Sequence, residues 1–240
     1  MKLICLGSSS KGNSYLLDNG SQTLVIEAGV RLAEVKKALD FNISRIVGCV
    51  ISHEHADHAG YVGDFLKYGI DVYCSPGTAE KFPKSHRLHR VPSGVTFKVG
   101  DFKILPFEVE HDAANPFGFL INHPETGNIL FLTDSYYSEF KFRNLNQIIL
   151  EINYDIEIMN TRSLHQSIKN RIINSHMSLE TAKELLRAND LSKVNNIVLI
   201  HLSDGNSHAE RFKKEIEDLT GKTVTVADTG TEINLNITPF

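Results

Sequence analysis

The sequence predicts a single α+β domain, and three observations support this prediction. Short apolar runs recur through the 240 residues and are separated by turn signals such as Asn19-Gly20 and Gly127-Asn128, which is typical of paired strands. Apolar residues at helical spacing lie between some of these runs. No repeat, low-complexity segment or linker divides the chain. We therefore expect one domain over residues 1–240, mostly β at first and with a strand–helix return at the end.

The composition is ordinary for a globular protein, with 41% hydrophobic and 22% charged residues. A net charge of -4 gives no global basic field for nucleic acid, although bound divalent metals add positive charge where a phosphate lies. The three cysteines lack CxxC spacing, which favours buried thiols in a reducing compartment. No apolar run approaches the ~20 residues of a membrane span. We expect a cytoplasmic protein with no membrane partner; the oligomeric state is left open.

Apolar runs and helical spacing predict the elements in chain order. Strands are predicted at residues 3–6, 15–17, 23–26, 46–51, 71–74, 95–99, 102–107, 117–121, 129–132, 148–152, 196–200, 223–226 and 233–237. Helices are predicted near residues 32–39, between His58 and Gly69, from the N-cap Ser178 to Leu186, and over residues 207–219.

Three polar segments separate these elements. Residues 7–14 form a tight Ser/Gly-rich loop that is either a surface connection or a nest of backbone N–H groups facing an anionic substrate. Residues 81–90 are the most basic stretch, and residues 156–175 are also polar and basic. A solvated face is the simpler interpretation of the stretch at 81–90, and contact with a substrate backbone is the alternative.

Candidate metal ligands follow the predicted strands. Three histidines and an aspartate lie within residues 53–58, directly after the apolar run at 46–51. Further candidates follow three other strands, and they are His111, Asp134 and His201. Imidazole and carboxylate groups suit zinc and its first-row neighbours. Ligands at several independent strand ends favour a metal centre over a His-rich loop without metal.

The spacing of these residues suggests two ions. His53 and His55 alternate, so they can share one face of an extended loop and reach one ion, which His111 could complete. The neighbouring pair Asp57-His58 points away from them, towards a second ion.

The remaining ligands complete this arrangement. His201 could complete the second shell, and the two oxygens of Asp134 could bridge both ions. Two ions about 3.5–4 Å apart can share a hydroxide and clamp a phosphoryl or acyl group. The sequence therefore predicts a dinuclear hydrolase that acts by attack of the bridging hydroxide.

The order of these residues resembles the metallo-β-lactamase superfamily, whose His-x-His-x-Asp-His motif is matched at residues 53–58. The resemblance implies a four-layer αββα sandwich with the metals at the mouth between two sheets. It implies that His53, His55 and His111 bind one metal, that Asp57, His58 and His201 bind the other, and that Asp134 bridges them. Residues 7–13, 111–116, 151–155 and 201–203 are similar to the YycJ/WalJ (VicX)-like hydrolases, near ribonuclease Z and the phosphodiesterase PhnP. This similarity implies phosphodiester cleavage and exonuclease action on DNA.

Three residues have further expected roles. His176 matches a histidine that is the proposed general acid of phosphodiesterase relatives, and a helix-capping or hydrogen-bonding histidine is the alternative. Asp57 could also accept a proton from the bridging water. Glu27 stands where the superfamily usually has an aspartate that orients the ligand loop, which puts metal affinity in question.

The substrate and the metal are less closely defined. Possible substrate-binding residues are Ser8, Ser9, Asn13, Asn153 and Asn206. Nucleic acid is the favoured substrate; hydrolysis of a cyclic phosphodiester, lactone or thioester is the alternative, and a non-catalytic, metal-stabilised regulatory protein is a third. Zn²⁺ is the expected metal, with Mn²⁺ or Fe²⁺ compatible with the same ligands.

Overall fold

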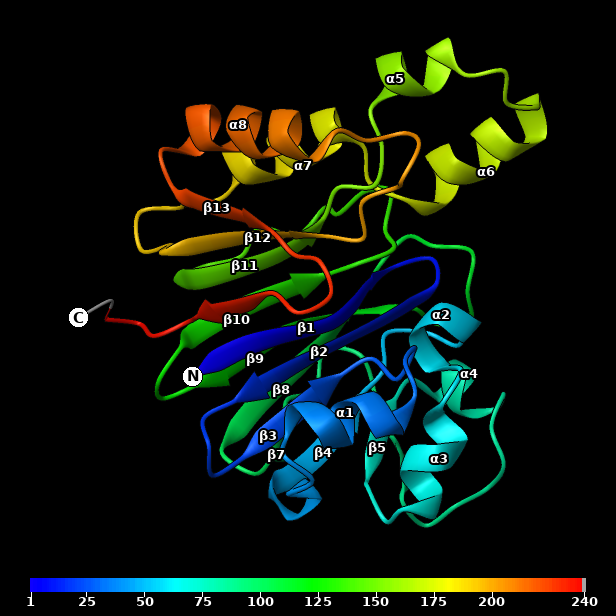
Figure 1. The fold of residues 1–240 in the computed structure, drawn as a ribbon, viewed down its shortest axis with the longest axis vertical. Coiled ribbons are helices and arrows are strands. Elements are labelled where there is room, and N and C mark those ends of the chain that lie inside the picture. The colour runs from blue at the N-terminus through cyan, green and yellow to red at the C-terminus, as the bar shows by residue number, and fades with distance from the viewer. Residues whose placement is uncertain (239–240) are drawn as a thin grey trace.

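Two seven-stranded sheets lie face to face in the computed structural model, which describes residues 1–238 (Figure 1). In order across the first sheet, the strands are β14 (Glu232–Asn234), β1 (Lys2–Ser9), β2 (Gly12–Asp18), β3 (Thr23–Ile26), β4 (Ile46–Val50), β5 (Val72–Cys74) and β6 (Leu88–Arg90). In order across the second sheet, they are β13 (Thr223–Val226), β12 (Asn196–Ile200), β11 (Leu145–Glu151), β10 (Gly127–Leu132), β9 (Phe117–His123), β8 (Phe102–Glu108) and β7 (Phe97–Val99).

Helices cover the outer face of each sheet. On the first sheet lie α1 (Leu32–Ala38) and α3 (Val62–Lys67), and on the second lie α7 (Leu179–Ala188) and α8 (Ala209–Thr220) (Figure 1). This arrangement confirms the expected αββα sandwich. The remaining helices are η1 (Ile43–Arg45), α2 (Ala56–Ala59), α4 (Pro76–Ala79), α5 (Ile156–Thr161) and α6 (Gln166–Ser175). The last two project beyond the end of the second sheet, apart from α7 and α8 (Figure 1).

Buried apolar side chains hold the four layers together. Tyr15 of the first sheet and Phe131 of the second are fully buried between the sheets, with ring centroids 5.6 Å apart. Phe65 of α3 packs on the outer face of the first sheet, and Phe212 of α8 on that of the second. Each such side chain contributes about 1.5–3 kcal/mol when buried. The residues between the sheets therefore hold the two sheets together, and those on the outer faces hold the helices on them.

Both sheets change from antiparallel to parallel pairing. Strands β14 to β3 and β7 to β10 are antiparallel with their neighbours, which confirms the predicted hairpins, whereas β3 to β6 and β10 to β13 are parallel. Parallel strands present their carboxyl ends at one edge of a sheet, where ligand-binding loops gather. The residues that follow β4, β10 and β12 are brought together in this way.

The structure differs from the sequence-based prediction in several segments. The expected loop at residues 7–14 is largely strand, because β1 and β2 stay paired as far as Ser9 and Gly12. Residues 156–175 contain α5 and α6, which have few buried apolar residues to signal them. Strand β6 lies within the basic stretch at 81–90, and β14 ends earlier than the predicted strand at 233–237. Within residues 1–238, no helix has both the length and the apolar character needed to cross a membrane.

Candidate active site

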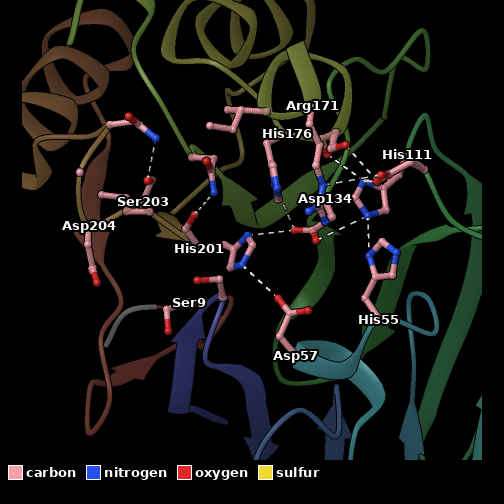
Figure 2. A pocket seen from close by; sticks show the side chains of 18 of the residues that line it. Ser9, His55, Asp57, His111, Asp134, Arg171, His176, His201, Ser203 and Asp204 are labelled. Atoms are coloured by element: carbon pink, nitrogen blue, oxygen red, sulfur yellow. Dashed lines mark hydrogen bonds and ion pairs between the residues drawn. The ribbon is translucent and has the colours of Figure 1, made fainter. Parts of the chain in front are cut away.

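The predicted ligands meet at a cavity of about 520 Å³ beside the ends of β10, β11 and β12 (Figure 2). The predicted ligands and catalytic residues that line it are His55, Asp57, His111, Asp134, His176 and His201. His53 and His58 are buried close to these residues. The structure therefore brings together all seven predicted ligands from four separate segments of the chain.

Three histidines direct ring nitrogens towards one point. His53 Nε2 lies 3.0 Å from His55 Nδ1, which lies 3.2 Å from His111 Nε2. Together with Asp134 they offer ligand atoms that all lie within 4.8 Å of one another. Nitrogen ligands about 2.0–2.1 Å from one zinc ion are about 3.3 Å apart in a tetrahedral shell. The spacing of the three ring nitrogens therefore fits one shared ion.

A second set consists of Asp57, His58, Asp134 and His201, whose ligand atoms also lie within 4.8 Å of one another. His58 Nε2 is 3.1 Å from Asp134 Oδ2 and 3.4 Å from Asp57 Oδ2. His201 Nε2 is buried and finds no hydrogen-bond partner within the described part of the chain. Because a buried polar atom normally has a partner, this nitrogen fits a cation ligand. Asp134 belongs to both sets, so the arrangement suits two neighbouring cations.

The charge of the site is concentrated on Asp134. Its carboxylate lies within 4.0 Å of ring nitrogens of His53, His58, His111, His176 and His201. Burial raises the pKa of Asp134, but His201 and His58 outweigh burial and hold this pKa well below its usual range. Burial lowers the pKa of His58 and of His201, but Asp134 and its neighbours outweigh it and raise both pKa values. The buried carboxylates thus require positive charge beside them, which protons or divalent cations can supply.

Three site residues have an unusual backbone conformation. Glu27, Asp134 and His201 have positive φ values of 68°, 44° and 53°. Glu27 and His201 lie directly after strands, and Asp134 lies two residues after the end of β10. A non-glycine residue in this region costs about 1–3 kcal/mol and persists only where its surroundings hold it in place. The strand ends therefore turn sharply at these residues, and the turn directs Asp134 and His201 towards the cavity (Figure 2).

Hydrogen bonds behind the ligands fix their orientation. The Glu27 carboxylate accepts the Ser52 N–H at 3.2 and 3.3 Å, and its Oε1 lies 3.7 Å from His58 Nδ1. Burial raises the pKa of Glu27. His111 Nδ1 donates to the Ser175 carbonyl oxygen at 2.8 Å, which leaves Nε2 for a cation. Glu27 thus lies behind the ligand loop, and its effect on metal affinity stays a prediction.

Glu151 is a buried residue of this site outside the set predicted from the sequence. Its Oε1 lies 2.7 Å from His176 Nδ1 and 2.9 Å from His201 Nδ1. Burial lowers the pKa of His176, but Glu151 outweighs burial and raises it. Glu151 is the last residue of β11, and other site residues likewise lie at or just after the ends of β4, β10 and β12. The same strand-end pattern in the sequence could therefore have identified it.

The predicted substrate contacts divide into two groups. Those that line the cavity are Ser9, Asn153 and Asn206. Ser8 and Asn13 contact site residues instead: Ser8 Oγ accepts the His201 N–H at 2.8 Å, and Asn13 Nδ2 lies 3.1 Å from His58 Nε2. Their binding of substrate stays a prediction.

Two arginines from the polar segment at 156–175 also line the cavity. Arg162 Nη1 donates to Asn206 Oδ1 at 3.0 Å. Arg171 is 75% exposed at its side chain, and its Nε lies 4.0 Å from Asp112 Oδ2. An exposed ion pair at this distance contributes little to stability, so the Arg171 guanidinium remains available to another anion.

Comparison with known sequences identifies relatives along most of the chain. A family model described as the Beta-lactamase superfamily domain matches residues 22–202. The exodeoxyribonuclease WalJ of Streptococcus pneumoniae serotype 2 is 29% identical over 227 residues, which cover 87% of this chain and 84% of that protein. The exodeoxyribonuclease YycJ of Bacillus anthracis is 26% identical over 232 residues, which cover 89% and 87%.

Comparison with solved structures supports the fold. The metallo-beta-lactamase fold protein YhfI from Bacillus subtilis superimposes with a TM-score of 0.72. The alignment covers 97% of this chain and 99% of YhfI, with 14% sequence identity. At that identity the likeness concerns the arrangement of the sheets and helices.

Proposed function

Because the chain belongs to the beta-lactamase superfamily, we propose that it is a dinuclear metal-dependent phosphodiesterase that acts on DNA as an exonuclease. Two relatives that match most of this chain are named exodeoxyribonucleases, which supports DNA as the substrate. The proposed ligands are His53, His55 and His111 for one ion, Asp57, His58 and His201 for the other, and Asp134 for both. Zn²⁺ is the proposed metal, and the donor set also accepts Mn²⁺ or Fe²⁺.

One observation carries the proposal: the two ligand sets share Asp134 and lie beside a histidine that a buried carboxylate holds in place. His176 lines the cavity, and its Nδ1 lies 2.7 Å from Glu151 Oε1. Hydrolysis of a phosphodiester requires an activated water on one side of the phosphorus and a proton for the oxygen that leaves. The arrangement offers groups for both requirements.

Divalent ions bound here would lower the pKa of water and polarise the phosphoryl oxygens. The side chains supply the proton transfers. Asp57 lines the cavity and is proposed to accept a proton from the attacking water. His176 is proposed to donate a proton from Nε2 to the leaving oxygen, because Glu151 holds its Nδ1. Such general acid catalysis typically contributes about 10²–10⁴-fold.

The arginines of the cavity supply charge for the substrate. Arg162 and Arg171 line the cavity together with the hydroxyl group of Ser9 and the side chain of Asn153. Guanidinium groups match phosphate oxygens with two parallel hydrogen bonds. We propose that these side chains bind the phosphates of the strand. Four aspartates also line this cavity, so bound divalent cations would have to add to the charge of the two arginines to attract the phosphates of DNA.

A substrate panel tests the proposed function. The purified protein, reconstituted with Zn²⁺ or Mn²⁺, is incubated with single- and double-stranded DNA, RNA, cyclic nucleotides, bis-p-nitrophenyl phosphate, a lactone and a thioester. We expect end-labelled DNA to shorten stepwise. Asp134→Asn should be inactive, because Asp134 belongs to both ligand sets. Hydrolysis of the lactone or thioester with DNA left intact would contradict the proposal and favour a small-molecule hydrolase.

The role of His176 is tested by His176→Ala. We expect kcat on DNA to fall by about 10²–10⁴-fold because the leaving oxygen loses its proton donor. Metal content, measured by inductively coupled plasma mass spectrometry, should be unchanged. His86→Ala is the matched control, since His86 is exposed and does not line the cavity. Loss of metal in His176→Ala would assign His176 to the metal site instead.

We also propose that residues 1–240 form one domain in the cytoplasm. One cluster of buried side chains contains residues of both sheets, which supports a single folding unit. Cys5, Cys49 and Cys74 are free and buried, which fits a reducing compartment.

A further inference from the structure

Helix α6 carries an apolar surface that the fold leaves open. Ile168 and Ile172 are four residues apart on α6, so they lie on the same face of the helix. Ile168 is 49% exposed. Within residues 1–238, neither isoleucine belongs to the three clusters of buried apolar side chains. Core packing therefore does not account for these two side chains.

This face of α6 lines a second cavity, of about 590 Å³, beside the catalytic one. The second cavity, here called the α6 groove, is lined by Ser10, Ser167, Ile168, Arg171, Ile172 and His176. Four of these residues also line the catalytic cavity, so the two spaces adjoin. In Figure 2, Arg171 and His176 lie on the same side of the catalytic cavity. A ligand bound at the metal ligands can therefore extend along His176 into the groove.

We propose that the α6 groove binds the nucleobase on the leaving-group side of the scissile phosphodiester. The inference rests on the proposed function. His176 is the proton donor to the leaving oxygen, and it borders both cavities. The nucleoside that carries the leaving oxygen is therefore the one beside the groove.

The chemistry of the groove matches a nucleotide. The faces of a base are apolar and can pack on Ile168 and Ile172, which supply contact that does not depend on base identity. Arg171 lies where the two cavities adjoin, so its charge can meet the phosphate while the base enters the groove. A base at the end of a single strand has a face free for this contact.

Abasic oligonucleotides test this placement. Single-stranded substrates are prepared with the base removed on one side or on the other side of the scissile bond, and mass spectrometry of the products shows which side carries the leaving oxygen. We expect kcat/KM to fall about five- to tenfold when the leaving-side base is missing, the lower part of the range for loss of one base contact. Ile168→Ser/Ile172→Ser should show the same fall on intact DNA and little further fall on the abasic substrate.

Ile173→Ser is the matched control, because Ile173 is on the same helix, is 37% exposed and lines neither cavity. It should keep the wild-type ratio between intact and abasic substrates. If the ratio of kcat/KM between intact and abasic substrates were the same in the wild type and the double variant, and DNA were still cleaved, the inference would be overturned and the proposed function would stand. Failure of the wild type to cleave any DNA would overturn the proposed function as well. If the wild type formed a dimer and the double variant did not, the groove would be assigned to a second copy of the chain and the inference would be overturned.

Discussion

At the residue scale, Gly29 lies between the backbone of Asp57 in the ligand loop at residues 53–58 and the start of β2. Its N–H donates to the Asn13 carbonyl oxygen at 2.9 Å, and the Ala28 N–H donates to the His58 carbonyl oxygen at 2.7 Å. A Cβ atom built on Gly29 would overlap the Asp57 carbonyl oxygen and lie 2.6 Å from the Asn13 nitrogen. Only glycine lets the backbones come this close. The position of Asp57 thus depends on a residue without a side chain.

Gly29→Ala should displace the Asp57 backbone. We expect a loss of about 1–3 kcal/mol in the free energy of unfolding, the usual cost of overpacking, together with a lower metal content. Gly63→Ala is the control: Gly63 lies in α3 with open space around its Cβ position, and alanine there should preserve or raise stability. Denaturant unfolding and metal analysis measure both effects. Equal metal content in the two variants would contradict the role of Gly29.

At the scale of elements, the junction between α6 and α7 determines where His176 lies. The Ser178 side chain caps α7 by accepting the Thr181 N–H at 3.1 Å, as the sequence predicted. The Asn153 N–H donates to the Met177 carbonyl oxygen at 2.9 Å. Met177, the residue after His176, is therefore tied to the segment that follows β11. This tie brings His176 to Glu151, the last residue of β11.

The caps of these two helices should contribute differently to global stability. Ser178→Ala should lower the free energy of unfolding by about 0.5–2 kcal/mol, because α7 packs on the sheet and its cap is lost only on unfolding. His165→Ala removes the cap of α6, which has one buried residue, Ser175, and should fray locally with less effect on global unfolding. Urea denaturation of both variants gives the comparison. Equal losses would show that α6 unfolds together with the sheets.

At the scale of the whole molecule, the site joins the two sheets. His53 and His58 follow β4 of the first sheet, whereas Asp134 and His201 follow β10 and β12 of the second. Cations bound to both groups would therefore link the sheets as well as serve catalysis. Since cations require the folded arrangement of ligands, their binding free energy adds to the stability of the fold.

Removal of metal with EDTA should therefore lower the melting temperature. A ligand at 100 times its Kd adds about 2.7 kcal/mol, and in a domain of 150–250 residues each kcal/mol shifts Tm by about 2–4 °C. We expect a decrease of roughly 5–10 °C on chelation, reversed by added Zn²⁺. Differential scanning calorimetry measures the melting temperature, and EDTA should lower it less in Asp134→Asn than in the wild type. The same melting temperature with and without EDTA would contradict the link between the sheets.

The sequence by itself determined most of the strands along the chain, although not β6, and the seven candidate ligands. Each ligand follows an apolar run, and a run of buried residues that ends at a polar side chain is visible locally. The tertiary structure alone decided which distant groups meet. Glu151 and His176 are 25 positions apart and become partners only through the tie between the β11 end and the α7 start. The sequence also did not reveal the open face of α6, because residues 156–175 were predicted only as a polar and basic segment, without a helix. Periodicity shows that a face is apolar, whereas the packing of other elements decides whether that face is covered.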